Sequence, residues 1–147
     1  MKFVLDSSAI VPILHEEDQS KNALQFIESC QDEGISLAVS TLVYYEIGNC
    51  IVQFAQKEKK NGQKYLSHLL AMQFEVVPMN NELLIFAMGL AQKERVTYYD
   101  AIHAGSALIE NAPLITLDKE LLTKFKNTMA VEEGIEYVKT LKTLKRD

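Results

Sequence analysis

The chain has 147 residues, 48% of them apolar and 24% charged, which is typical of one globular domain. Its net charge of −5 argues against a protein that coats nucleic acid non-specifically, although a carboxylate cluster that binds divalent cations would lower the charge too. No apolar run approaches the roughly 18 residues of a membrane span. Asp6 interrupts the N-terminal apolar stretch, which argues against a signal peptide. We expect a cytoplasmic protein in which Cys30 and Cys50 are buried free thiols.

In chain order, short apolar runs alternate with longer segments of helical periodicity. Residues 3–5 predict a strand that ends at Asp6, and Ser7 or Ser8 is expected to cap a helix with Pro12 in its first turn. The next expected elements are a helix from Asp18 to Gln31 stopped by Gly34, a strand from Ile35 to Val39, a helix capped by Ser40 or Thr41 that runs to about Gln56, and a helix over 63–73 after a charged turn.

The second half of the chain continues this alternation. Its expected elements are a strand over 75–78, a helix capped by Asn80 or Asn81, a helix over 98–111 capped by Thr97, a strand over 114–117, and a short helix opened by Asp118. The segment 135–138 fits either a fifth strand or the start of a final helix. Strands separated by such helices pair in parallel. We therefore expect a single α/β domain over 1–147, with three layers and a central parallel sheet of four or five strands.

Four acidic residues stand where an open parallel sheet binds ligands, in the crevice beyond the carboxyl ends of its strands. Asp6 and Asp118 each follow a strand directly, and Glu46 and Asp100 lie among apolar residues near the starts of two helices. A charge in such surroundings is costly unless it is paired or metal-bound. Each acid alone has an ordinary alternative as a helix cap, a dipole-favoured residue or a solvent-facing residue. Their joint placement favours one acidic site.

The order and spacing of these motifs resemble the PIN-domain family, and especially its VapC-like toxin ribonucleases. The resemblance rests on VLDSSA at 4–9, YEI at 45–47, YDAIHA at 99–104 and LITLDK at 114–119. It implies a PIN-like fold and a ribonuclease in which the four acids form the catalytic cluster. It also implies that Ser8 and Thr116 support that cluster through hydroxyl hydrogen bonds.

The donor types agree with a hard divalent cation. Carboxylate oxygens from Asp6, Glu46, Asp100 and Asp118 suit Mg²⁺ or Mn²⁺, whereas the chain offers no Cys/His cluster for zinc. A bound ion can activate the water that attacks a phosphodiester, and a second ion can stabilise the departing 3′ oxygen. The sequence leaves one and two ions equally open.

Other residues near the acids are candidates for substrate contact. His103 lies three residues after Asp100, so it could form a hydrogen bond with a carboxylate or approach the substrate. A partly buried histidine bonded to a backbone carbonyl is the commoner arrangement, and it is the one that we expect here. Lys119 adjoins Asp118 and is a candidate phosphate contact. Four tyrosines are expected to pack, with stacking on unpaired bases as the alternative: Tyr44, Tyr45, Tyr98 and Tyr99.

The leading hypothesis is an endoribonuclease that is the toxin of a toxin–antitoxin pair. The resemblance implies an RNA substrate and an antitoxin whose amphipathic helix lies in an apolar groove around 11–14 and 47–54, with a basic side chain reaching the acids. It also implies a homodimer, for which the helix over 83–90 is a candidate contact. The alternatives are an RNA-processing nuclease outside such a pair, a non-catalytic metal-binding module, and a phosphate-ester hydrolase with Asp6 as nucleophile. Ser8 argues against the hydrolase, because that mechanism calls for a second Asp two residues after the nucleophile.

Overall fold

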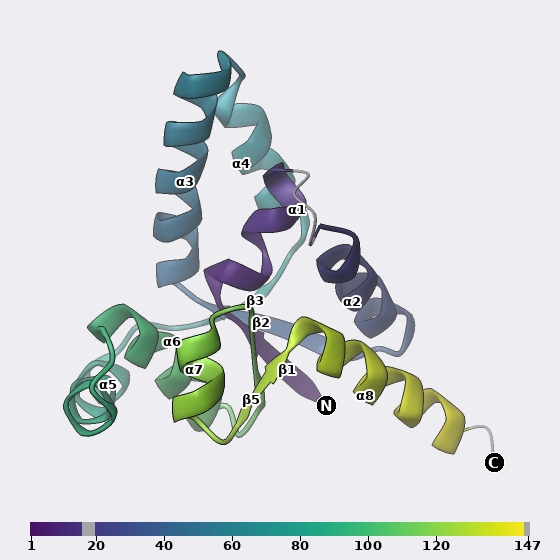
Figure 1. The fold of residues 1–147 in the computed structure, drawn as a ribbon, viewed down its shortest axis with the longest axis vertical. Helices are drawn as coiled ribbons and strands as arrows, with labels where there is room; N and C mark the ends of the chain where they lie inside the picture. Colours follow the sequence, from purple (N-terminus) through teal and green to yellow (C-terminus); the bar gives the residue numbers. More distant parts are fainter. Residues whose placement is uncertain (16–19, 146–147) are drawn as a thin grey trace.

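Five parallel strands form the central sheet, in the order β3-β2-β1-β4-β5. The structure is a computed structural model that describes residues 1–15 and 20–145 (Figure 1). The strands are β1 (Lys2–Leu5), β2 (Ser36–Ser40), β3 (Glu75–Val77), β4 (Leu114–Thr116) and β5 (Thr128–Ala130). The helices are the 3-10 helix η1 (Ser7–Ala9), α1 (Val11–His15), α2 (Ser20–Asp32), α3 (Leu42–Glu58), α4 (Gly62–Ala71), α5 (Asn81–Glu94), α6 (Tyr98–Ile109), α7 (Lys119–Lys124) and α8 (Val131–Leu144).

The expected α/β class and parallel sheet are confirmed, and the ambiguous C-terminal tail is resolved. The fifth strand is β5, and the segment 135–138 lies inside α8. Val131, Ile135 and Val138 recur at helical spacing and are all buried, which favours the helix. The expected start of the second helix at Asp18 lies outside the described residues.

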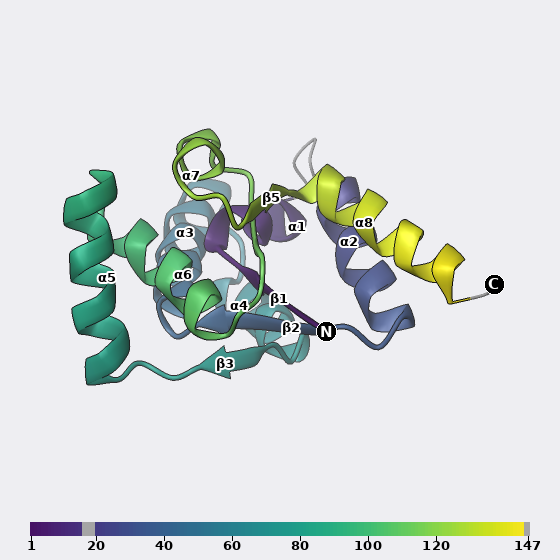
Figure 2. The same ribbon diagram turned by 90° about the horizontal axis from the view of Figure 1, so that it is seen from below.

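Alternate residues of the strands face two separate cores, so the sheet lies between two helical layers. Phe3 and Leu5 pack on one face with residues of α2 and α8, whereas Val4 packs on the other face with residues of α6 and α7. Figure 2 shows α2 and α8 on one side of the strands and α5 and α6 on the other. Because strand side chains alternate between faces, this period of two produces the three-layer architecture.

The chain path brings four segments to the carboxyl edge of the sheet. η1 follows β1, α3 follows β2, and α7 follows β4. α6 runs back under the sheet, contacts β1, β2 and β4, and ends just before β4 begins. Its N-terminus therefore lies at the same edge as the other three segments, which is where open parallel sheets bind ligands.

Side-chain caps fix most of these helix starts, but α3 begins after Thr41 without the expected side-chain cap. Asn80 and Thr97 accept hydrogen bonds from backbone N–H groups of α5 and α6, as expected. The first cap differs from expectation, because Asp6 rather than Ser7 or Ser8 accepts the bond from Ala9 N–H at the start of η1. Asp6 can do this because its side chain is already turned inward at the end of β1.

Two further expectations concern the thiols and the membrane. Cys30 is a fully buried free thiol, and burial raises its pKa to about 12. Cys50 is only half-buried, against expectation, because it lies on the flank of α3 rather than on its inner face. Within the described residues, no helix is both long enough and apolar enough to cross a bilayer.

Candidate active site

Asp6 is the buried centre of the acidic edge. Its side chain is 3% exposed, and both carboxylate oxygens are held from the protein side. Oδ1 accepts bonds from the Ser8 hydroxyl at 2.6 Å and from Ala9 N–H at 3.1 Å, and Oδ2 accepts one from the Thr116 hydroxyl at 2.5 Å. These bonds fix the orientation of the carboxylate at the end of β1.

The environment of Asp6 disfavours its negative charge. Burial raises the pKa of Asp6, and the nearby His103 and the hydrogen bonds from Ser8, Thr116 and Ala9 offset this only in part. A buried carboxylate in this state is stabilised by a proton or by a cation. Asp6 therefore has the electrostatic character expected of a metal ligand.

The two hydroxyls beside Asp6 also join β1 to β4. Ser8 Oγ accepts a bond from Leu117 N–H at 2.8 Å, and Thr116 Oγ1 accepts one from Asp118 N–H at 2.9 Å. The carboxylate of Asp118 caps α7, accepting from Glu120 N–H at 2.7 Å. A single hydrogen-bonded unit thus places Asp118 next to the Thr116 side chain that holds Asp6.

A second unit joins α3 to α6 through a buried histidine. His103 Nε2 lies 2.7 Å from Glu46 Oε2, and His103 Nδ1 lies 3.2 Å from Ser40 Oγ. A carboxylate only accepts, so Nε2 donates, and in the neutral ring Nδ1 accepts from the Ser40 hydroxyl. The expected backbone-carbonyl partner of His103 is therefore wrong. The ring is also 2% exposed with both nitrogens occupied, so the structure does not present it to a substrate.

The histidine controls the charge of Glu46 as well as its position. Burial opposes ionisation of Glu46, but the hydrogen bond and charge of His103, with a smaller contribution from Ser7, lower the pKa of Glu46 below its ordinary value. Glu46 is consequently held as a carboxylate beside the N-terminal turn that contains Asp6.

The fourth predicted acid, Asp100, lies in the first turn of α6. Thr97 Oγ1 donates to its carboxylate at 2.7 Å and accepts from its backbone N–H at 3.1 Å. Asp100 is half-buried and lies one helical turn before His103, so both side chains occupy neighbouring positions on α6. This places Asp100 near the junction of α3 and α6.

The four acids share one edge of the sheet without forming a ready-made metal cage. Among the described residues, no group of three or more His, Cys, Asp or Glu side chains is arranged to hold an ion. Each carboxylate instead has a hydrogen-bond donor of its own from the protein. The all-oxygen donor set and the buried Asp6 nevertheless fit a hard divalent cation in their chemistry.

The tyrosines divide into two pairs. Tyr44 packs against the main core, and Tyr98 packs against α5 and donates to Leu84 O at 2.9 Å. Tyr45 and Tyr99 are instead 70% and 60% exposed, so the packing expectation is wrong for these two. The tyrosine before each of them points inward, and because successive side chains on a helix point in different directions, the second tyrosine of each pair faces the solvent.

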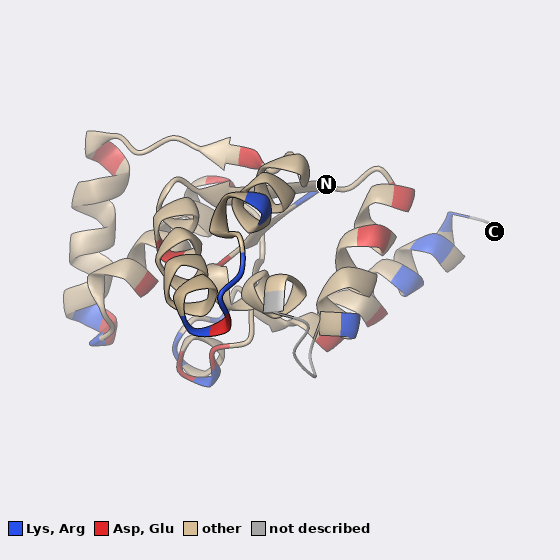
Figure 3. Cartoon of the chain, turned by 90° about the horizontal axis from the view of Figure 1, so that it is seen from above, with Lys and Arg blue, Asp and Glu red and all other residues tan. Residues whose placement is uncertain are grey.

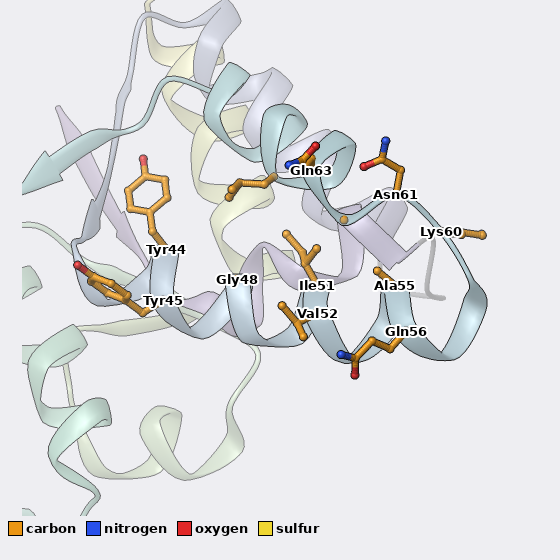
Figure 4. A pocket seen from close by; sticks show the side chains of 12 residues that line it. Tyr44, Tyr45, Gly48, Ile51, Val52, Ala55, Gln56, Lys60, Asn61 and Gln63 are labelled. Atoms are coloured by element: carbon orange, nitrogen blue, oxygen red, sulfur yellow. The ribbon is translucent and has the colours of Figure 1, made fainter.

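An apolar groove of about 750 Å³ lies between α3 and α4, beside the acidic edge (Figure 4). Ile51, Val52 and Leu66 contribute to its walls, and Tyr45 lies at the end nearest Glu46. The expected groove around 11–14 and 47–54 is therefore only partly right. Ile13 and Leu14 line a separate, smaller pocket of about 400 Å³, because α4 packs between α1 and the larger groove.

The molecule is a three-layer α/β protein with carboxylates and hydroxyls at the carboxyl edge of its sheet, where open parallel sheets bind ligands, and comparison with known proteins identifies its family. The PIN domain family model matches residues 3–127. The chain belongs to the PIN-domain family.

Individual relatives agree with this assignment. The chain is 30% identical over 130 residues to the ribonuclease VapC3 of Pyrobaculum aerophilum, covering 85% of this chain and 95% of that protein. Its fold is similar to the crystal structure of PAE2754 from Pyrobaculum aerophilum, with TM-score 0.73, 24% identity, and 95% and 90% of the two chains covered. It is also similar to VapBC2 from Rickettsia felis, solved with a DNA fragment, with TM-score 0.66, 19% identity, and 88% and 97% coverage.

Proposed function

We propose that this protein is a metal-dependent endoribonuclease and the toxin of a toxin–antitoxin pair. The observation that carries the proposal is the buried Asp6 carboxylate, held by Ser8 and Thr116 at the carboxyl edge of the sheet. The other three acids lie around the same edge, in a PIN-domain chain that is 30% identical to a ribonuclease. A binding module without catalysis would not need this complete set.

The acids and the residues around them have separate tasks in the proposed site. Asp6, Glu46, Asp100 and Asp118 would hold one or two Mg²⁺ or Mn²⁺ ions, which when bound supply Lewis-acid activation of water and stabilise negative charge on the leaving oxygen. Ser8 and Thr116 keep both oxygens of Asp6 fixed, and His103 orients Glu46. Lys119 is exposed beside Asp118, where its ammonium group can meet a phosphate of the RNA.

The partner of a toxin must silence this site. VapBC2 of Rickettsia felis, which has a similar fold, was solved as a complex, and another similar structure is a toxin–antitoxin complex from Klebsiella pneumoniae. We expect an amphipathic antitoxin helix in the groove between α3 and α4, followed by an arginine that pairs with the acids. A homodimer is expected through the exposed apolar side chains Ile85, Phe86 and Met88 of α5.

Cleavage of a labelled RNA tests the catalytic proposal. Wild-type protein should cut the RNA with Mn²⁺ and should not cut it in EDTA. Asp6→Asn should abolish cleavage while the circular dichroism spectrum stays unchanged, because Asn keeps the volume but loses the charge. Glu136→Gln removes an exposed carboxylate on α8 and is the matched control that should cut normally. An Asp6→Asn protein that cuts at the wild-type rate would reject the site.

Expression of the chain alone tests the toxin role. Growth should stop, and the arrest should disappear in the Asp6→Asn variant and when the gene of an adjacent antitoxin is co-expressed. Unimpaired growth in cells that contain active protein would instead support an RNA-processing nuclease outside a toxin–antitoxin pair.

A further inference from the structure

We infer that Tyr45 and Tyr99 form a base-stacking pair that binds unpaired RNA nucleotides next to the catalytic acids. The inference rests on the proposed ribonuclease function and concerns how the protein holds its RNA. It assigns a binding role to two side chains that the acidic site itself does not use.

The positions of the two rings follow from the helices that carry them. Tyr45 directly precedes Glu46 on α3, and Tyr99 directly precedes Asp100 on α6. Tyr99 is also four residues before His103, so the two share a face of α6, and His103 contacts Glu46 at 2.7 Å. Both tyrosines therefore lie beside the junction where α3 meets α6.

The exposure of these rings is unusual for their size. A tyrosine ring is normally at least partly packed, as Tyr44 and Tyr98 are on the same two helix turns. Tyr45 and Tyr99 remain 70% and 60% exposed, and neither hydroxyl has a hydrogen-bonding partner among the residues that the structure describes. Two open aromatic faces beside a phosphodiesterase site are the feature by which proteins bind single strands.

Positive charge at the far end of the apolar groove complements an RNA backbone. The turn between α3 and α4 is rich in lysine in a chain of net charge −5 (Figure 3). Lys60 lines the far end of the groove whose near end is formed by Tyr45 (Figure 4). Glu46 and Lys57 are separated by roughly 17 Å along the axis of α3, so one single strand can reach both the acids and the lysines. Lys59 and Lys60 lie in this turn, and Lys57 at the end of α3 and Lys64 at the start of α4 flank it.

Stacking on these rings selects unpaired RNA. Bases inside a duplex are already stacked on their neighbours, and their faces are not available to a side chain. Bases of a single strand or a loop can separate and stack on an aromatic ring, and this contact tolerates any base. The tyrosine pair therefore predicts that structure in the RNA, more than its sequence, decides whether a site binds here.

The test compares cleavage of an unstructured RNA with cleavage of the same RNA in a duplex, using full-length protein and Mn²⁺. Tyr45→Ala and Tyr99→Ala should each lower kcat/KM about 5- to 150-fold, mainly through KM. Tyr45→Phe and Tyr99→Phe keep the ring and should stay within about twofold of wild type. Leu144→Ala shortens an equally exposed side chain at the end of α8 and is the matched control.

A second measurement reports stacking without catalysis. RNA that contains 2-aminopurine should lose fluorescence on binding the Asp6→Asn protein, and Tyr45→Ala in that background should abolish the loss. Three outcomes would each overturn the inference. The alanine variants could be as active as wild type, the phenylalanine variants could be as weak as the alanine variants, or duplex RNA could be cut as fast as single-stranded RNA. A Tyr45→Ala protein that cuts normally but escapes its antitoxin would also overturn it, because the ring would then serve a protein partner.

These outcomes separate the two proposals. Wild-type protein that cuts no RNA refutes the ribonuclease proposal, while the 2-aminopurine signal still decides the stacking role. Normal cleavage by both alanine variants refutes the stacking role alone.

Discussion

His103 is predicted to act on cleavage through Glu46, and two amide substitutions separate its contacts. Glutamine carries its terminal amide about as far from the backbone as Nε2 of histidine, so His103→Gln can still donate to Glu46 but loses Ser40. Asparagine reaches only as far as Nδ1, so His103→Asn can still bond Ser40 but loses Glu46. The two variants therefore each remove one of the bonds at 2.7 Å and 3.2 Å.

The magnitudes follow from the type of bond that is lost. Removing a partner that orients a metal-binding carboxylate typically costs about 10- to 100-fold in activity, which is the loss expected for His103→Asn. A hydrogen bond to a charged group contributes about 1.5–3 kcal/mol to stability and a neutral one about 0.5–1.5 kcal/mol. His103→Asn should then lower the melting temperature by roughly 3–12 °C, and His103→Gln by less.

The assay measures kcat/KM for RNA cleavage at 25 °C, where circular dichroism confirms that both variants are folded. His103→Gln should remain within a few-fold of wild type, although its own stability is reduced. If His103→Gln loses as much activity as His103→Asn, or if His103→Asn cuts like wild type, the orienting role of His103 is refuted.

Three further predictions concern packing, metal and pH. Gly134→Ala would place a Cβ 2.7 Å from the Phe26 ring, so it should be about 1–3 kcal/mol less stable than Gly89→Ala, which meets nothing within 4 Å; equal melting temperatures would contradict this. Mn²⁺ at a hundred times its Kd should stabilise wild type by about 2.7 kcal/mol, and no change in melting or calorimetry would reject the metal site. The pH prediction concerns metal-free protein in EDTA, where burial raises the pKa of Asp6 in the folded state. The protonated Asp6 side chain therefore contributes to the free energy of unfolding below the unfolded-state pKa near 4, and this contribution is lost as the pH rises through the folded-state pKa. The melting temperature of Asp6→Asn minus that of wild type should therefore grow with pH over this window, and a flat or falling difference would refute the assignment.

Local sequence determined the elements and the edge of the sheet at which the acids lie. Period-two and period-3.6 patterns are short-range properties, so the first four strands and most helices could be predicted from them. Asp118 and Thr97 were identified as helix starts because capping depends on backbone N–H groups only two or three residues away. The strand β5 was not assigned, because a three-residue edge strand has too few residues to show a period.

Contacts between distant residues were decided only by the tertiary structure. The bond from Thr116 to Asp6 spans 110 residues, and the bond from His103 to Glu46 spans 57. No local pattern indicates that a histidine on α6 will be buried against a carboxylate on α3, since that depends on how both helices pack at the sheet edge. The exposure of Tyr45 and Tyr99 is of the same kind. Each tyrosine pair has one inward and one outward ring, and only the packing of α3 and α6 against their neighbours decides which ring faces the solvent.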